Sequence, residues 1–314
     1  ARVVLESWWL GLNPHTRRSF GAAYRQMVSY LGGPELPADQ ASEIQAVIAL
    51  ARHFGSVSPG EAYALVVAWR GHLQQAGLAP GSVNRRLTAL KSLTKRLSLA
   101  GLMSYQLTIE RIREELYRDT SGPGADGVRA LLETTSRGTE RDLRDRAMLR
   151  LLADLALRRS ELTGLDVEDV DLTRKQVWVL RKGKLQKTKL DLSPKAARDL
   201  AAWIEIRAFL LTPDALGRHP LFVPIDQHGN LRSMRLTGTG VYLCVRGRGL
   251  KAGVKARPHG IRHTSAVTAL SVTNGNLEAV RELLGHEGYQ AAKHYLRELQ
   301  GLQRQVSEQI SNAW

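Results

Sequence analysis

Residues 175–193 read KQVWVLRKGKLQKTKLDLS and contain two runs of β-type character, at 175–181 and 188–192. A short basic segment with one glycine separates these runs. Two short strand-like runs joined by a glycine-containing turn are typical of a β-hairpin. We therefore expect a small antiparallel sheet at this place, within a chain whose other periodic segments have helical spacing.

The segments on both sides of the hairpin are predicted to be helical. Residues 142–157, DLRDRAMLRLLADLAL, form the expected helix before it. After the hairpin, helices are expected at about 194–211, 237–249, 259–272, 276–284, 288–298 and 300–313. This half of the chain is predicted to be mostly helix with one minor sheet.

The first hundred residues are predicted to form a small helical bundle. A helix is expected over 14–31, with Thr16 as its N-cap and with apolar side chains at helical spacing: Phe20, Tyr24, Met27 and Leu31. Further helices are expected over 38–53, from Ser58 or Pro59 to Gly77, and over 82–101. The last of these has an apolar stripe of Val83, Leu87, Leu90, Thr94 and Leu97.

A linker is predicted between the two halves. The sequence RDTSGPGADG at 118–127 is rich in turn-forming residues. We expect a first domain at 1–110, a linker at 111–127 and a second domain at 128–314.

The chain is strongly basic. It holds 45 Lys and Arg against 30 Asp and Glu, a formal net charge of +15, and both halves are basic, as in proteins that contact nucleic acid. A basic surface that is merely solvated is the weaker alternative. No apolar run approaches the roughly 18 residues of a membrane span, and no secretory signal is expected. The single cysteine excludes an intramolecular disulfide and favours a reducing, cytoplasmic compartment.

One predicted helix has an unusual excess of positive charge. No acidic residue lies between Ser82 and Leu102, so local ion pairs cannot neutralise its five cations, which are Arg85, Arg86, Lys91, Lys95 and Arg96. The simpler interpretation is the solvated face of an amphipathic helix. We favour a helix that faces DNA.

Three further segments bring together cations and proton-transfer groups: ALRRSELTGL (156–165), LRKGKLQK (180–187) and RPHGIRHTSAVTAL (257–270), which leads to LGHEGYQAAKHY (284–295). There is no matching cluster of carboxylates, which metal-dependent nucleases need. The set suits stabilisation of an anion without a metal or other cofactor. A zinc site built on His259 and His263 is disfavoured, because Arg262 between them would repel the cation.

His259 and Arg262 are three residues apart, so on a helix they project from one face toward the same ligand. Arginine can clamp two phosphate oxygens at once. The structural alternative, in which Arg262 pairs with a carboxylate and His259 caps the helix, loses weight beside the other two segments.

In order and spacing, these motifs resemble the catalytic signature of tyrosine recombinases, the family of phage integrases and Xer-type recombinases. The motifs are LRRSEL, a lysine in a β-turn (RKGK), HGIRHT, and LGH followed nine residues later by tyrosine. Residues 13–31 and 81–103 also resemble the family's N-terminal core-binding domain. The resemblance implies a mainly α fold with a small antiparallel β-sheet, in which a helical DNA-binding domain precedes an α+β catalytic domain with a C-terminal interaction helix.

Carried over residue by residue, the resemblance makes Arg158 and Arg262 the phosphate-clamping arginines. Lys182 becomes the mobile general acid, and Glu161 is similar to the acidic residue that holds the first arginine in place. Two departures from the family pattern occur. Ala156 replaces the usual glycine, which we expect to be harmless, and the turn is one residue longer, so Lys184 is a second candidate for the acid.

The same resemblance makes Tyr295 the nucleophile, His259 a proton acceptor or donor beside the phosphate, and His286 a further hydrogen-bond donor to it. A free tyrosine has a pKa near 10, so at neutral pH it needs a base or a positive field to attack. In one unbroken helix His286 and Tyr295 would lie on opposite faces. We therefore expect Gly285 and Gly288 to end one helix and start another, which leaves Tyr289 and His294 as bystanders.

The implied activity is site-specific DNA recombination through a covalent 3′-phosphotyrosine link, as in integration, resolution or dimer resolution. The implied partners are double-stranded DNA with a recombination site, three further copies of the chain in a tetramer on two sites, and in some systems an accessory DNA-binding protein. With no arm-binding domain before residue 1 of this sequence, we expect a Xer-like or resolution system, with a truncated chain as the alternative. The stripe Leu302, Val306 and Ile310 would dock on a neighbouring protomer or on its own domain, with equal weight.

Two other functions are weighed against this one. A type IB topoisomerase shares the tyrosine nucleophile, but the two-domain layout and the LGH motif favour recombination. A DNA-binding protein without catalysis would have no need to keep Tyr295, Lys182 and both arginines together. We expect a cytoplasmic, nucleoid-associated enzyme.

Overall fold

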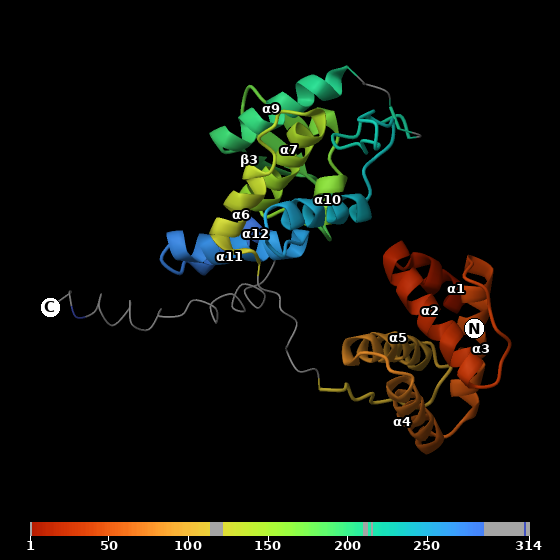
Figure 1. Ribbon diagram of the computed structural model, residues 1–314. Coiled ribbons are helices and arrows are strands. Elements are labelled where there is room, and N and C mark those ends of the chain that lie inside the picture. Colours follow the sequence, from red (N-terminus) through yellow and green to blue (C-terminus); the bar gives the residue numbers. More distant parts are fainter. Residues whose placement is uncertain (1, 114–121, 210–212, 215, 286–310, 312–314) are drawn as a thin grey trace. The chain divides into compact units, whose positions relative to one another are not determined.

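The computed structural model describes residues 2–113, 122–209, 213, 214, 216–285 and 311. The chain divides into two compact units, Ala1–Arg118 and Asp119–Trp314 (Figure 1). The described part of the first unit contains helices alone, and the second combines helices with a small antiparallel sheet, which confirms the predicted fold class. None of the described helices has the length and apolar character that crossing a bilayer requires.

Five helices build the first unit: α1 (Arg2–Gly11), α2 (Pro14–Tyr30), α3 (Gln40–Ser56), α4 (Pro59–Gln75) and α5 (Pro80–Leu99). A proline stands in the first turn of α2, where its missing N–H is not needed. Asn13 caps this helix by accepting a hydrogen bond from the His15 N–H at 2.9 Å. The predicted cap, Thr16, was wrong because it already lies within the first turn. Helix α1 was not predicted from the sequence.

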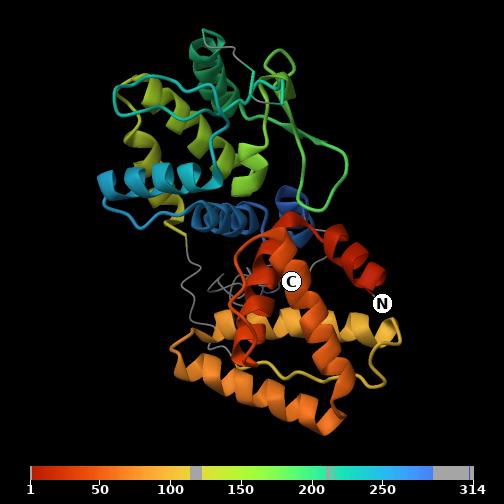
Figure 2. The same cartoon turned by 90° about the vertical axis from the view of Figure 1, so that its right-hand side faces the viewer.

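The core of the first unit is rich in aromatic side chains. Trp9 of α1, Tyr24 of α2 and Trp69 of α4 are fully buried, and the Tyr24 hydroxyl donates to the Ala89 carbonyl at 2.9 Å. Helix α5 packs against α2, α3 and α4 (Figure 2). The predicted stripe of α5 is confirmed as its buried face.

The ends of the expected linker, 111–127, differ from the structure. The Asn84 side chain of α5 exchanges two hydrogen bonds of 2.8 Å with the backbone of Ile112, so the chain is still held by the first unit at that residue. Helix α6 (Gly124–Glu133) already begins within the expected linker. The predicted linker was therefore too long at both ends.

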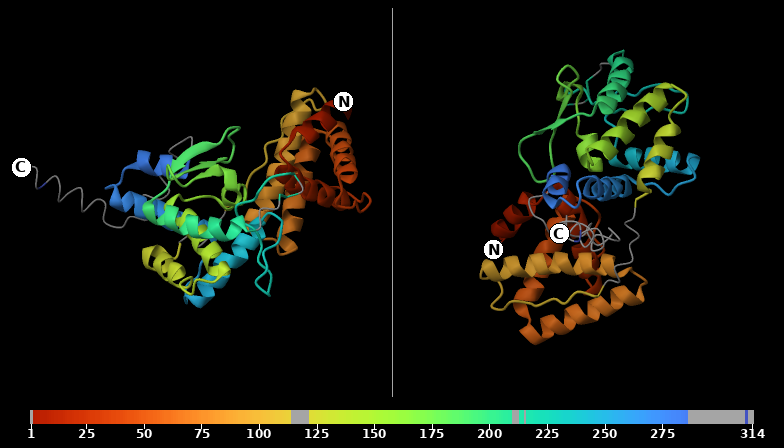
Figure 3. Two further views of the ribbon diagram at one scale, coloured as in Figure 1. Left: turned by 90° about the horizontal axis from the view of Figure 1, so that it is seen from above. Right: turned by 90° about the vertical axis from the view of Figure 1, so that its left-hand side faces the viewer.

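The second unit contains one small sheet among helices. Its helices are α6, α7 (Glu140–Asp154), α8 (Arg159–Thr163), a 3-10 turn (Val167–Asp169), α9 (Pro194–Ala208), α10 (Gly238–Lys251), α11 (Pro258–Val272) and α12 (Leu277–Leu284). The strands are β1 (Val170–Asp171), β2 (Gln176–Val179) and β3 (Thr188–Asp191), paired antiparallel in the order β1-β2-β3. The hairpin of β2 and β3 is the predicted one (Figure 3).

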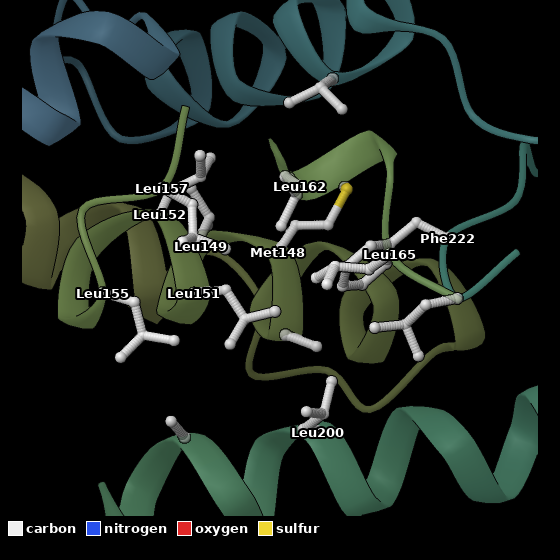
Figure 4. Packing of buried hydrophobic residues seen from close by; sticks show 14 of the residues in the cluster. Met148, Leu149, Leu151, Leu152, Leu155, Leu157, Leu162, Leu165, Leu200 and Phe222 are labelled. Atoms are coloured by element: carbon white, nitrogen blue, oxygen red, sulfur yellow. The ribbon is translucent and has the colours of Figure 1, made fainter. Parts of the chain in front are cut away.

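A continuous apolar core places α7 at the centre of the second unit. Figure 4 shows Leu151 on α7 facing Leu200 on α9, and Met148 on the other side of α7 beside Leu162 of α8. Val177 and Val179 point from β2 into the same core. Because α7, α8 and β2 share this core, the loops that follow α7 and β2 are held in fixed positions relative to one another.

Candidate active site

Arg158 lies at the N-terminus of α8, immediately after the turn that ends α7. Its main-chain N–H donates to Oε2 of Glu161 at 2.8 Å, and its Nη1 donates to Oε1 of the same carboxylate at 2.6 Å. The Glu161 side chain is 1% exposed, whereas that of Arg158 is 25% exposed. The buried Glu161 carboxylate therefore holds the Arg158 side chain in place, while part of that side chain stays accessible to solvent.

The turn before Arg158 has unusual backbone geometry. Ala156, which replaces the family's glycine, has a φ of 48°, in the left-handed region that favours glycine. A side chain in this region costs about 1 kcal/mol. The Ala156 methyl group is fully buried against α11 and α12. That the replacement is harmless stays a prediction.

Glu161 gathers positive groups from three separate parts of the second unit. Nη1 of Arg181, from the hairpin, donates to its Oε2 at 3.3 Å, and the Lys182 main-chain N–H donates to its Oε1 at 3.1 Å. Nη1 of Arg262, from α11, lies 4.0 Å from Oε2. One buried carboxylate thus faces three guanidinium groups, including that of Arg158.

Burial alone would raise the pKa of Glu161. Hydrogen bonds from the Arg158 N–H and guanidinium and from the Lys182 N–H outweigh this effect and hold the pKa below its ordinary value. The carboxylate is therefore charged at neutral pH. Its single negative charge does not neutralise the three guanidiniums, so the cluster has an excess of positive charge.

Arg262 is buried, and it joins the turn after α7 to the end of α12. Its Nη1 donates to the Ala156 carbonyl and its Nη2 donates to the Leu284 carbonyl at 2.8 Å. His259, one turn earlier on α11, is exposed. Partial desolvation and the positive charge of Arg262 lower the pKa of His259 below its ordinary value, so the imidazole is neutral at pH 7 and able to accept a proton.

The two candidate lysines, Lys182 and Lys184, lie at the exposed end of the hairpin. Gly183 between them has a φ of 86°, and the Lys184 N–H donates to the Arg181 carbonyl at 3.0 Å, which closes the turn. The backbone of Lys182 is bound to Glu161, whereas its side chain is exposed. The backbone hydrogen bond to Glu161 ties Lys182 to the arginine cluster.

Some predicted residues lie outside the described part of the chain. These are His286, Gly288, Tyr289, His294, Tyr295, the helices predicted at 288–298 and 300–313, and the C-terminal stripe of Leu302, Val306 and Ile310. The end of α12 is described, and Gly285 adopts a left-handed φ of 58° there. The prediction that Gly285 ends a helix is therefore confirmed.

The five cations of α5 divide into two groups. Arg85, Lys91 and Lys95 are exposed. Arg86 donates to the Gln26 side chain and the Ser82 carbonyl, and the Arg96 guanidinium lies 5.9 Å from the Trp8 ring centre. These two arginines therefore also stabilise the packing of the first unit.

Arg181 was not among the predicted site residues, yet its guanidinium lies closer to the Glu161 carboxylate than that of Arg262 does. A signal for it was present. Side chains alternate in a strand, so the inward face that contains Val177 and Val179 continues to residue 181. The buried positions are indeed Val177, Val179 and Arg181.

Known proteins resemble this chain over most of its length. Residues 124–301 match the phage integrase family. The chain is 33% identical over 260 residues to a tyrosine recombinase of Synechococcus elongatus, covering 82% of this chain and 79% of that one. It is 30% identical over 291 residues to the tyrosine recombinase XerC of Mycobacterium bovis, covering 91% and 88%.

A solved structure has a similar fold. The XerH site-specific recombinase bound to its difH substrate superposes with a TM-score of 0.57 at 17% identity, over 93% of this chain and 95% of that chain.

Proposed function

Since this chain belongs to the phage integrase family and is a Xer-like tyrosine recombinase, an enzyme of site-specific DNA recombination, we propose roles for its residues in strand cleavage. The observation that carries the proposal is the group of three arginines around Glu161. Arg158 and Arg262 stabilise the negative charge that builds on the non-bridging oxygens of the scissile phosphate. Glu161 orients Arg158 for this task.

Tyr295 is the nucleophile in this proposal. Its hydroxyl oxygen bonds to phosphorus, the bond from phosphorus to the 5′-oxygen breaks, and a covalent 3′-phosphotyrosine link results. His259, neutral because of its lowered pKa, accepts the tyrosine proton. Lys182 gives a proton to the leaving 5′-oxygen, and His286 donates a hydrogen bond to the phosphate. The link retains the bond energy, so religation needs no ATP and no metal.

The substrate in this proposal is double-stranded DNA with a specific recombination site. Four copies of the chain act on two sites, with an accessory DNA-binding protein as a further partner, and the enzyme works in the cytoplasm where it meets DNA. Arg85, Lys91 and Lys95 of α5 are exposed and contact the phosphate backbone. The C-terminal stripe of Leu302, Val306 and Ile310 docks on a neighbouring protomer or on its own domain.

A covalent adduct on nicked DNA tests this function. The site is first selected from a random duplex library by binding to the full chain, and a nick is placed next to each candidate phosphate in turn. Because the short fragment beyond the nick diffuses away after cleavage, religation fails and the adduct accumulates. We expect a protein–DNA adduct that survives sodium dodecyl sulfate. No such adduct at any phosphate of the selected site would contradict the enzyme's proposed chemistry.

The choice between Lys182 and Lys184 has its own test. Lys182→Ala is expected to slow cleavage by about 10²- to 10⁴-fold, the usual contribution of a general acid. A substrate with sulfur in place of the 5′-bridging oxygen should restore the rate, because a thiolate leaves without a proton. The matched change Lys184→Ala should alter neither rate by more than a few fold. Sulfur rescue of Lys184→Ala instead would assign the acid to Lys184.

A further inference from the structure

Arg181 is buried in a loop that is otherwise exposed. All other residues from Leu180 to Lys189 are exposed, and Leu185 is 100% exposed, whereas Arg181 is 3% exposed. Burying a guanidinium is costly unless its donors are paired, and burying a leucine is favourable. The loop thus buries its arginine and exposes its leucines, which indicates that the contacts of the arginine matter more than apolar packing here.

These contacts join the hairpin to the end of α12. Nη2 of Arg181 donates to the Leu283 carbonyl at 3.1 Å, while its Nη1 donates to Glu161. The last carbonyls of a helix lack partners within the helix and are the negative end of its dipole. A cation that binds Leu283 therefore stabilises this end of α12 directly.

Gly285 allows the guanidinium to lie this close. A Cβ atom at residue 285 would lie 3.1 Å from Nε and 3.2 Å from Cδ of Arg181, closer than ordinary contacts. The left-handed φ of Gly285 independently disfavours any side chain there. A residue without a side chain at the end of α12 therefore leaves room for the Arg181 side chain.

A second arginine completes the arrangement. Arg262 donates to the Leu284 carbonyl, so two successive carbonyls at the end of α12 bind two different guanidiniums. Both guanidiniums lie near Glu161, which also binds the Lys182 backbone. The hairpin, the carboxylate and the end of α12 therefore form one connected network of hydrogen bonds and ion pairs.

We propose that Arg181 is a positioning residue that ties the loop of Lys182 to the end of α12, from which the chain continues toward His286 and Tyr295. This inference rests on the proposed function, because it concerns the positions of Lys182, His286 and Tyr295 in the proposed cleavage reaction. Arg181 acts through its neighbours: it keeps the Lys182 backbone on Glu161 and fixes the residue at which the chain leaves α12.

The test compares two substrates in variants of the full chain. In Arg181→Met, cleavage of the nicked duplex with a normal 5′-oxygen is expected to fall by about 10²-fold, because a general acid that is displaced loses much of its contribution. The sulfur-bridged duplex should be cleaved with a smaller loss, since it needs no acid. Arg181→Met should still cleave the sulfur-bridged duplex more slowly than the unchanged chain does, because the change also releases the end of α12. Lys182→Ala, in contrast, should cleave this duplex at the normal rate.

Controls separate positioning from folding. Arg174→Met makes the same substitution at an exposed arginine in the turn between β1 and β2, where it pairs with Asp171, and should leave both rates near those of the unchanged chain. Arg181→Lys keeps the charge but replaces the two nitrogen donors, which a planar group holds apart, with a single nitrogen. This variant should remain folded, and its sulfur-bridged substrate should again lose less rate than its oxygen substrate, with smaller losses than in Arg181→Met.

Equal losses on the two substrates, or unchanged rates, in both Arg181 variants would overturn the inference. If sulfur also failed to rescue Lys182→Ala, the proposed role of Lys182 would be wrong. With Lys182→Ala rescued and the Arg181 variants showing equal losses, the positioning role alone would fail.

Discussion

Tyr295→Phe is expected to abolish the covalent protein–DNA adduct while leaving DNA binding intact. Removal of the hydroxyl removes the only atom with which this residue can attack phosphorus, so the cleavage rate should fall by at least about four orders of magnitude. Binding depends on cationic side chains and phosphates, which the change does not touch. Gel shift with the selected site and adduct formation on its nicked form measure the two properties separately.

Tyr289→Phe is the matched control, because it removes the same atom from a tyrosine six residues earlier. This variant should form adduct at nearly the normal rate. An adduct that persists in Tyr295→Phe and disappears in Tyr289→Phe would reverse the assignment of the nucleophile. Loss of binding in Tyr295→Phe would instead mean that the residue has a structural role.

Glu161→Gln is expected to destabilise the second unit by about 3 to 5 kcal/mol. The change keeps the size of the side chain but removes the charge that Arg181 and Arg262 face, and both guanidiniums are buried. A buried charge that loses its partner is strongly destabilising. Urea unfolding of the full chain, followed by hydrogen exchange in peptides of α7 and α11, measures this unit separately from the first.

Glu278→Gln provides the control for charge removal as such. Glu278 pairs with Arg281 on the exposed side of α12, where ion pairs contribute about 0.5 kcal/mol. If Glu161→Gln cost no more than Glu278→Gln, the carboxylate would not hold the arginines together.

The pH dependence of stability provides a second measure of Glu161. Its pKa is lowered in the folded state, so its contribution is fully present above its ordinary value of 4.5. This contribution is lost as the pH falls below that value toward the lower pKa of the folded protein. The unchanged chain should therefore lose stability in this acid range more steeply than Glu161→Gln. Parallel curves for the two proteins would contradict this account.

The spacing of apolar residues predicted most of the fold, because the apolar face of each helix or strand is the face that is buried. The stripe of α5 and the hairpin of β2 and β3 came from spacing alone, since each has a clear apolar face. Helix starts were less predictable. Asn13 rather than Thr16 caps α2, because Pro14 is suited to the first helical position and thereby sets where the cap must lie.

The candidate site could be predicted only in part. The order of motifs pointed to Arg158, Lys182, His259 and Arg262, and the structure brings the first two and Arg262 around Glu161. Arg181 was missed because its partners, Glu161 and Leu283, are 20 and 102 residues away in sequence. Likewise, the strained backbone of Ala156 depends on how α7 meets α8, which no local pattern shows.

The most direct test of the central claim is to identify the residue that bears the nucleotide after cleavage. Trypsin cuts after Arg281, Lys293 and Arg297, so Tyr289 and Tyr295 fall in different peptides. The adduct on the selected nicked site is digested with nuclease and trypsin and analysed by mass spectrometry. We predict an acid-stable nucleotide on residues 294–297, which contain Tyr295. A nucleotide on residues 282–293, or an acid-labile one on His294, would contradict the assignment.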